Sequence, residues 1–263
     1  MQSLSLTVLV LALYEAAAFM PMGRTVSPSK LTASLMDPEV MGPPPSPWDI
    51  SAITPDGALK QRVEGLSRRT WEFNDLDKDR VQVALESEGR PIKAEVQLWI
   101  GPDWTPFMLK AYSENGRLRP INTIVGTRNK NAMIECRNVA EYEFPFNAAA
   151  NYAQGPMASL ALDIPMGMPG AERVDGGAVR STVLDFSTER LDVVLNTEGR
   201  QLNARIELLS GPNNPKQTFE VFTNNGELNS LCVSFNTVEA GNTFRVVNLA
   251  PIEFPLYYYT VEL

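Results

Sequence analysis

The sequence predicts an all-β protein made of two tandemly duplicated antiparallel β-sandwich-like units, which together form a pseudo-twofold monomer. Three observations support this prediction. The chain repeats itself at an offset of 110 residues, apolar residues alternate with polar ones in both copies, and neither copy contains a convincing helical period. With 263 residues, 44% of them hydrophobic, the chain is long enough to bury an ordinary core.

The duplication is the most informative feature of the chain. Residues 80–145 align without a gap over residues 190–255, and about 19 aligned positions are identical. Chance can match a few dipeptides, but not this many at one offset. The landmarks of the first copy are Gly89, Gly101, Pro102, Asn115, Gly116, Glu143, Phe144 and Pro145. Their counterparts in the second copy are Gly199, Gly211, Pro212, Asn225, Gly226, Glu253, Phe254 and Pro255.

The N-terminal residues 1–36 have the composition of a bipartite plastid-targeting presequence. An apolar run over residues 4–13 is of signal-peptide length and too short to span a bilayer, so no membrane insertion is expected. The stretch 23–34 is basic, rich in hydroxyl groups and free of acids, as in a transit peptide. A buried N-terminal helix is the alternative. The apolar run departs from a typical signal peptide in that no Lys or Arg precedes it. We expect the mature chain to begin between Phe19 and Asp37.

Residues 37–69 form a Pro-rich N-terminal arm that contains Pro43-Pro44-Pro45-Ser46-Pro47-Trp48. Such an arm can dock through its Trp or remain a frayed terminus.

The first β repeat is assigned to residues 70–146. Val81, Val83 and Leu85 alternate with other residues, and the alternation resumes over 92–100 after a turn at 87–90. Asn115-Gly116 is typical of a type I′ hairpin, because both residues tolerate positive φ. Apolar runs at 121–125 and 133–136 then complete a predicted meander.

Residues 147–179 are an Ala/Gly/Pro/Met-rich connector, part of which is expected to pack on a β surface. The second β repeat, residues 180–263, repeats the strand pattern and the Asn225-Gly226 hairpin signal. Its aromatic tail contains Tyr257, Tyr258 and Tyr259. Such a strand-prone tail either adds to a neighbour's sheet edge or closes its own sandwich.

The composition excludes most common enzyme chemistries. The chain contains no histidine and only two cysteines, Cys136 and Cys232, so catalytic triads, His-ligated zinc and four-cysteine clusters are excluded. There is no phosphate-binding loop, dinucleotide fingerprint or nucleophile elbow. A net charge of −8 argues against nucleic-acid binding. We therefore expect no enzyme activity, no cofactor and no metal, and buried thiols.

Three weaker candidates remain. Asp75, Asp77 and Asp79 could suggest a calcium loop, although the EF-hand glycine and glutamate are missing and a solvated turn fits better. Glu143 and Glu253 could form a carboxylate pair, but their repetition favours a structural role. Trp99 and Trp104 could stack on a sugar, but the second copy has no tryptophan at either place.

The presequence, the acidic histidine-free chain and the repeated G-R-x-[IL]-x-A, G-P, N-G and N-x-A-x-x-E-F-P motifs resemble the pyrenoid shell proteins of diatoms and related algae. The resemblance covers residues 70–263. It implies a non-catalytic protein of the chloroplast stroma that assembles with itself into a thin sheet or tube at the pyrenoid periphery, around the Rubisco matrix. It leaves Rubisco or other pyrenoid proteins open as partners. It also implies that the landmark residues carry the fold and lattice contacts.

A second hypothesis from another class stays open. A duplicated β-sandwich without catalytic parts also suits a plastid-stromal binding module that recognises a glycan or a thylakoid protein complex.

Overall fold

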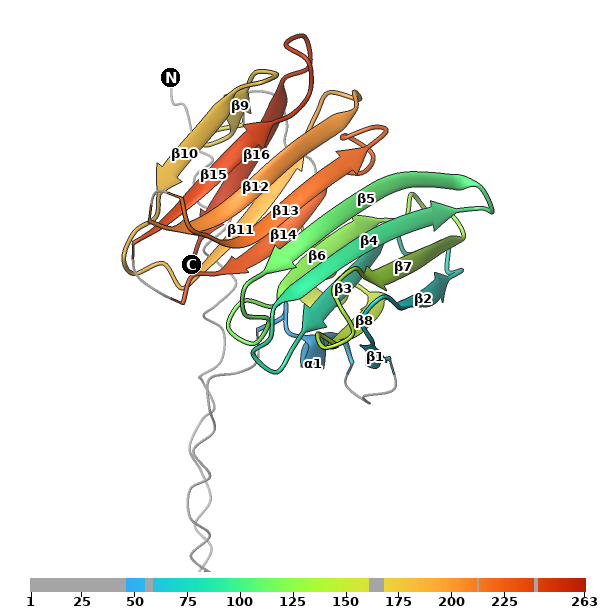
Figure 1. Ribbon diagram of the computed structural model, residues 1–263. Helices are drawn as coiled ribbons and strands as arrows, with labels where there is room; N and C mark the ends of the chain where they lie inside the picture. The colour runs from blue at the N-terminus through green and yellow to red at the C-terminus, as the bar shows by residue number, and fades with distance from the viewer. Residues whose placement is uncertain (1–45, 55–58, 161–167, 212, 239–240) are drawn as a thin grey trace, which may run out of the picture. The chain divides into compact units, whose positions relative to one another are not determined.

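Strands from both copies pair with one another in two antiparallel sheets, each of eight strands (Figure 1). The computed structural model describes residues 46–54, 59–160, 168–211, 213–238 and 241–263, all within one unit, 44–263. The predicted presequence, residues 1–36, lies outside the described residues. The architecture is all-β and confirms the predicted sandwich-like fold class, with the strands of both repeats in the same two sheets.

Each sheet contains four strands of each copy. Sheet A has, in spatial order, β1 (Gln61–Val63), β8 (Phe146–Tyr152), β3 (Arg80–Glu86), β6 (Ile121–Gly126), β14 (Leu231–Asn236), β11 (Arg190–Asn196), β16 (Leu256–Glu262) and β9 (Glu172–Val174). Sheet B has β10 (Val179–Val183), β15 (Asn242–Asn248), β12 (Leu202–Ser210), β13 (Pro215–Thr223), β5 (Trp104–Ser113), β4 (Ile92–Ile100), β7 (Ala132–Asn138) and β2 (Arg68–Phe73).

The two copies meet across a pseudo-twofold axis that crosses both sheets. In sheet B, β5 pairs antiparallel with β13, and Lys110 lies opposite Glu220, its own equivalent 110 residues later. In sheet A, β6 pairs with β14, and Thr123 lies opposite its equivalent Val233. An antiparallel pair of equivalent strands is symmetric about an axis perpendicular to the sheet. The copies are therefore fused into one sandwich instead of two neighbouring ones.

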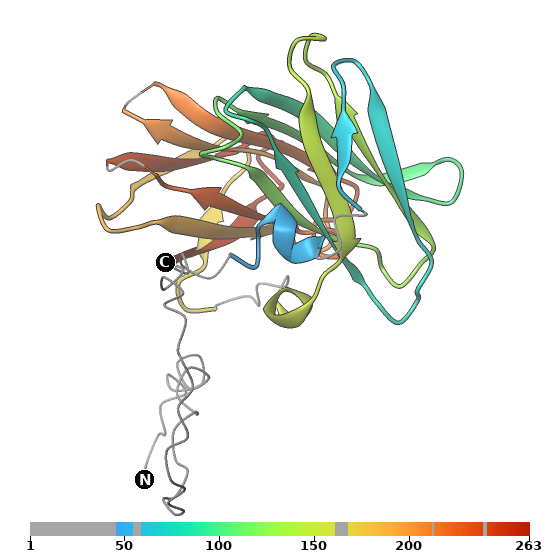
Figure 2. The same cartoon turned by 90° about the horizontal axis from the view of Figure 1, so that it is seen from below.

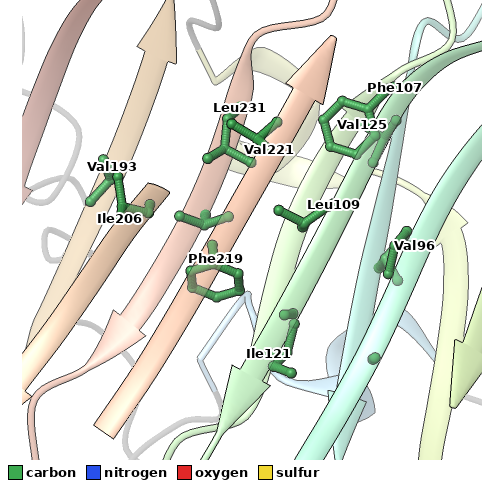
Figure 3. Packing of buried hydrophobic residues seen from close by; sticks show 14 of the residues in the cluster. Val96, Phe107, Leu109, Ile121, Val125, Val193, Ile206, Phe219, Val221 and Leu231 are labelled. Carbon is green, nitrogen blue, oxygen red and sulfur yellow. The ribbon is translucent and has the colours of Figure 1, made fainter. Parts of the chain in front are cut away.

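One hydrophobic core fills the space between the sheets and runs across both copies (Figure 3). Inward residues alternate along the strands, for example Leu202, Ala204, Ile206 and Leu208 on β12. The second copy adds a row of edge-to-face aromatic contacts with ring centroids 5.0–6.0 Å apart. This row consists of Phe219, Phe235, Phe244 and Tyr258.

The arm docks on the outer face of sheet A. Trp48 is buried against Ile124, Val194 and Cys232, and its Nε1 donates to Asp192 Oδ2 at 3.3 Å. The following short helix α1 (Ile50–Ile53) packs against β3 and β8 (Figure 2). The 3-10 helix η1 (Gly155–Ser159) buries Met157 in the Trp48 cluster. Within the arm, residues 46–54 are therefore docked on the sheet and are not a frayed terminus.

The outer face of sheet B instead carries ion pairs. Glu135 accepts from Arg68 at 3.3 Å and from Arg137 at 2.8 Å. In the second copy Glu207 lies 3.2 Å from Arg205 and 3.3 Å from Arg245. The two faces of the sandwich therefore differ in chemistry.

The predicted Asn-Gly hairpins and the meander are wrong. β5 lies in sheet B and β6 in sheet A, so Asn115-Gly116 connects the two sheets, as Asn225-Gly226 does in the second copy. Neither glycine has a positive φ, which a type I′ turn requires. Among the described strands, β4–β5 and β12–β13 are the only pairs that are consecutive in sequence and also adjacent in a sheet.

The aromatic tail closes its own sandwich. β16 pairs with β11 on one side and β9 on the other, so it is an interior strand of sheet A. β8, within the stretch assigned to the connector, takes the equivalent place in the first copy, next to β3 and β1. In the described residues each copy therefore contributes eight strands, and the tail is part of the repeat.

The aromatic row predicts a local difference in stability. Phe235→Ala should lower the free energy of unfolding by about 3–5 kcal/mol, because it leaves a cavity between its two aromatic neighbours, Phe219 and Phe244. Phe186→Ala, at a side chain that is 78% exposed, should change it by less than about 0.5 kcal/mol. Urea denaturation of both variants measures the difference, and equal effects would contradict the packing described.

Candidate assembly surface and the landmark network

Most landmark residues of each copy lie in one network at one end of the strands, whereas Gly101-Pro102 and Gly211 lie in the β4–β5 and β12–β13 turns at the other end. Gly116 N donates to Arg90 O at 3.0 Å, and Gly226 N donates to Arg200 O at 2.7 Å. A Cβ atom on Gly116 would lie 2.3 Å from Ile92 Cδ1, and one on Gly226 would lie 2.5 Å from Thr197 Oγ1. Glycine is therefore needed here for close packing, not for its backbone angles.

The asparagine before each of these glycines shapes the sheet-to-sheet connection. Asn115 Oδ1 accepts from the backbone N–H groups of Arg117 at 3.0 Å and Leu118 at 3.2 Å. Asn225 Oδ1 accepts from those of Glu227 and Leu228, both at 3.0 Å. These are side-chain turns of the kind that asparagine favours.

A buried asparagine, which the predicted site residues omit, links the loop that carries Glu-Phe-Pro to the sheets. Asn248 Nδ2 donates to Phe254 O at 2.9 Å and Val174 O at 3.0 Å, and its Oδ1 accepts from Ala250 N. Asn138 does the same in the first copy, with Phe144 O, Val63 O and Ala140 N. Both side chains are fully buried, and the shared N-x-A motif was the signal that could have identified them.

The remaining landmarks surround this asparagine or turn the chain. Glu143 O accepts from Arg90 Nη1, whereas Arg200 lies over the ring of Phe254 at 5.3 Å. The side chains of Glu143 and Glu253 are exposed, and those of Phe144, Pro145, Phe254 and Pro255 are half-buried. Gly89, Gly199, Gly101 and Gly211 have φ values of 67–90° in turns. Pro102 is exposed in the turn before β5, and Pro212 lies outside the described residues.

The weaker chemical candidates form no site. Asp75 Oδ1 accepts from Asp77 N at 3.1 Å, and its carboxylate pairs with Lys78 at 3.2 Å, which also holds its pKa below the usual value. No group of three or more acidic or cysteine side chains in the described ranges could hold a metal ion. The ring of Trp104 is faced by Arg128 at 5.1 Å and Lys130 at 6.0 Å.

The thiols and the tail tyrosines are structural. Cys136 and Cys232 are free and fully buried, and burial raises the pKa of both thiols far above the ordinary value. Tyr258 donates to Glu172 at 2.6 Å, and burial raises its pKa. Tyr257 and Tyr259 are half-buried on β16.

Exposed apolar side chains recur at equivalent places of the two copies. At four pairs of equivalent positions, 110 residues apart, the apolar side chain is exposed in both copies. These pairs are Leu76 and Phe186, Leu118 and Leu228, Val139 and Leu249, and Tyr142 and Ile252. All lie in loops between strands. Scattered exposed apolar residues need no explanation, but repetition of the same positions does.

The pseudo-twofold axis places the two members of each pair at opposite ends of the strands. β6 and β8 both pair antiparallel with β3, so the loops that precede them, which carry Leu118 and Tyr142, lie at the same end. β14 runs antiparallel to β6, so the equivalent loops of the second copy lie at the other end. Each end of the sandwich therefore presents a set of exposed apolar residues. We call these two sets the loop-end patches: one contains Leu118 and Tyr142, and the other contains Leu228 and Ile252.

The fold and the landmark network define a duplicated β-sandwich. Its repeated motifs form turns, and its outer surface remains available for contacts with other molecules. The family described as diatom pyrenoid shell protein matches residues 54–262. This chain belongs to that family, whose name indicates a structural role in the pyrenoid, a compartment of the chloroplast. No helix among the described residues is long and apolar enough to cross a membrane.

Other comparisons add little. No curated protein matched the chain. Among solved structures, the PBSX exported protein XepA is 10% identical, with a TM-score of 0.29 over 77% of this chain and 84% of that one. Oxalate decarboxylase from Bacillus subtilis is 9% identical, with a TM-score of 0.16 over 78% and 74% of the two chains. These similarities are too low to support any functional argument.

The buried asparagine makes a testable contribution to stability. Asn248→Ala should lower the free energy of unfolding by several kcal/mol. Each of the three backbone groups left without a partner contributes about 1–3 kcal/mol, unless water reaches it. Asn203→Ala, at a half-buried outward position of β12, is the control and should cost less than about 0.5 kcal/mol. Thermal denaturation compares them, and a neutral Asn248→Ala would contradict the role assigned to the network.

The buried thiols predict how stability depends on pH. The folded-state pKa is raised, so each thiol favours the fold fully below its unfolded pKa of about 8.5, and this contribution falls as pH rises further. The free energy of unfolding should fall by up to about 1.4 kcal/mol per pH unit for each thiol as pH rises from roughly 9 to 10. Cys136→Val, which copies Val246 of the second repeat, should remove one thiol's share of that slope in urea denaturation under reducing conditions. An unchanged slope would contradict the assignment.

Proposed function

We propose that this protein is a non-catalytic structural subunit that assembles with itself into a sheet-like shell around the Rubisco matrix of the pyrenoid. The shell lies in the chloroplast stroma at the pyrenoid periphery and supports CO₂ concentration and fixation. Membership of the shell-protein family is consistent with this role. Self-association needs no cofactor, and Rubisco or other pyrenoid proteins remain candidate partners.

The observation that carries the proposal is the repetition of exposed apolar residues. In a monomer, nothing would keep Tyr142 and Ile252 apolar, since they are 74% and 79% exposed. A sheet explains both, because each copy must contact neighbours on opposite sides. Two related patches at opposite ends of the strands meet that requirement.

Removing this repeated surface tests the proposal. The double variant Tyr142→Glu, Ile252→Glu should raise the critical concentration for assembly at least tenfold, which corresponds to about 1.4 kcal/mol per subunit. Light scattering of the chain from residue 37 measures that concentration, and electron microscopy identifies sheets or tubes.

Val238→Glu is the matched control. Val238 is 53% exposed, but its equivalent in the first copy is Arg128, so it has no repeated apolar partner. It should shift the critical concentration by less than about twofold, within the small effects usual for surface substitutions. A wild-type chain that stays monomeric across concentration and salt would contradict the proposed function and favour a binding module.

A further inference from the structure

The two free edges of sheet B lie on opposite lateral sides of the sheet, across the strands, and are equivalent by the pseudo-twofold axis. β10 pairs only with β15, and β2 only with β7, among the described strands (Figure 1). Each therefore presents one row of backbone groups without a ladder partner in the described part of the chain. Such a row is a template for pairing with another strand.

The inward hydrogen bonds identify which residues form each row. Asn248 N donates to Ala178 O, and Leu184 N donates to Asn242 O, so the even-numbered residues of β10 face β15. The backbone groups of Val179, Ser181 and Val183 consequently point away from the sheet. In β2, Asn138 N donates to Ser67 O, so Arg68, Thr70 and Glu72 are the outward residues.

The side chains of these rows are complementary to themselves but not to each other. Two copies of β10, antiparallel and centred on Ser181, place Val179 opposite Val183 of the second copy. Two copies of β2, centred on Thr70, place Arg68 opposite Glu72. An unlike pairing of β10 with β2 would instead set valines against Arg68 and Glu72. Opposite charges and β-branched residues are favourable cross-strand pairs.

β10 is also unusually open for an edge strand. All five of its residues are exposed, and the side chain of Val183 is 72% exposed. Edge strands of proteins that stay monomeric are usually blocked by charges, prolines or bulges. β10 has no proline and pairs with β15 without a bulge, and its one charge, Arg180, is not among the three residues of the outward row.

Building on the proposed self-assembly, we infer that copies join through like edges of sheet B, β10 to β10 and β2 to β2. Each contact is a twofold one, and the two contacts alternate. Because they lie on opposite edges of sheet B, they produce an open row in which sheet B continues from one copy to the next. The β10 contact would contain roughly six new backbone hydrogen bonds.

Single cysteine variants distinguish like from unlike pairing. At the centre of a twofold antiparallel contact, the two Cα atoms are about 5.5 Å apart, within reach of a short bis-maleimide. Cys136 and Cys232 are fully buried in the folded chain and do not compete for the reagent. Ser181→Cys alone and Thr70→Cys alone should each give covalent dimers in the assembled protein, and the double variant should give a ladder of longer oligomers. Thr218→Cys, in the middle of sheet B, should give none.

Salt separates the two contacts. At about 1 M salt the Debye length falls to about 3 Å, so the charged β2 contact should lose more cross-linked dimer than the apolar β10 contact.

Each other outcome overturns a defined part of the inference. Links that appear only when Ser181→Cys and Thr70→Cys chains are mixed would mean unlike edges pair. Links at one position alone would refute the other contact. Sheets in electron micrographs without any link would refute edge pairing and leave the proposed function standing, whereas a chain that never assembles would refute both.

Discussion

The antiparallel junction between the two repeats is the interaction on which the rest of the structure depends. β5 with β13 and β6 with β14 fuse four strands of each copy into each sheet. The junction continues beyond the strands, where Glu114 N donates to Lys216 O at 3.0 Å and Asn224 N to Pro106 O at 3.1 Å. Because equivalent residues face each other there, the axis is fixed. It sets where every repeated feature of the surface lies, including the two free edges and the two loop-end patches.

The sequence was sufficient for the fold class but not for the order of the strands. Alternation located β4 and β12 because one side of each faces the core and the other faces solvent. The pattern does not reveal β8, since Ala148 and Ala150 face the core while Ala149 packs under α1, so both sides are apolar and no alternation remains. The Asn-Gly signals marked real turns, but which sheet the next strand enters depends on tertiary contacts that local pattern does not contain.

The candidate site divides in the same way. The repeated landmarks were identified from sequence, and most proved to be turn residues, with Phe144 and Phe254 held by the buried Asn138 and Asn248. The exposed pairs such as Val139 and Leu249 were present in the alignment, but a sequence does not distinguish an apolar residue in the core from one on the surface. The edge residues of β10 and β2 required the ladder itself, because only the inward hydrogen bonds show which backbone groups remain.

These surfaces lie along two directions within one plane. The free edges of sheet B would extend an assembly across the strands, and the loop-end patches would extend it along them. Twofold axes of edge pairs in a continuous sheet are perpendicular to that sheet, so every copy in such a row would present sheet A on the same side. The assembled layer would then be one molecule thick with unlike surfaces, one carrying the docked segment around Trp48 and the other the ion pairs around Glu135 and Glu207. The proposed shell would then have distinct inner and outer surfaces, and this distinction follows from a duplication that repeated the strands but not the arm.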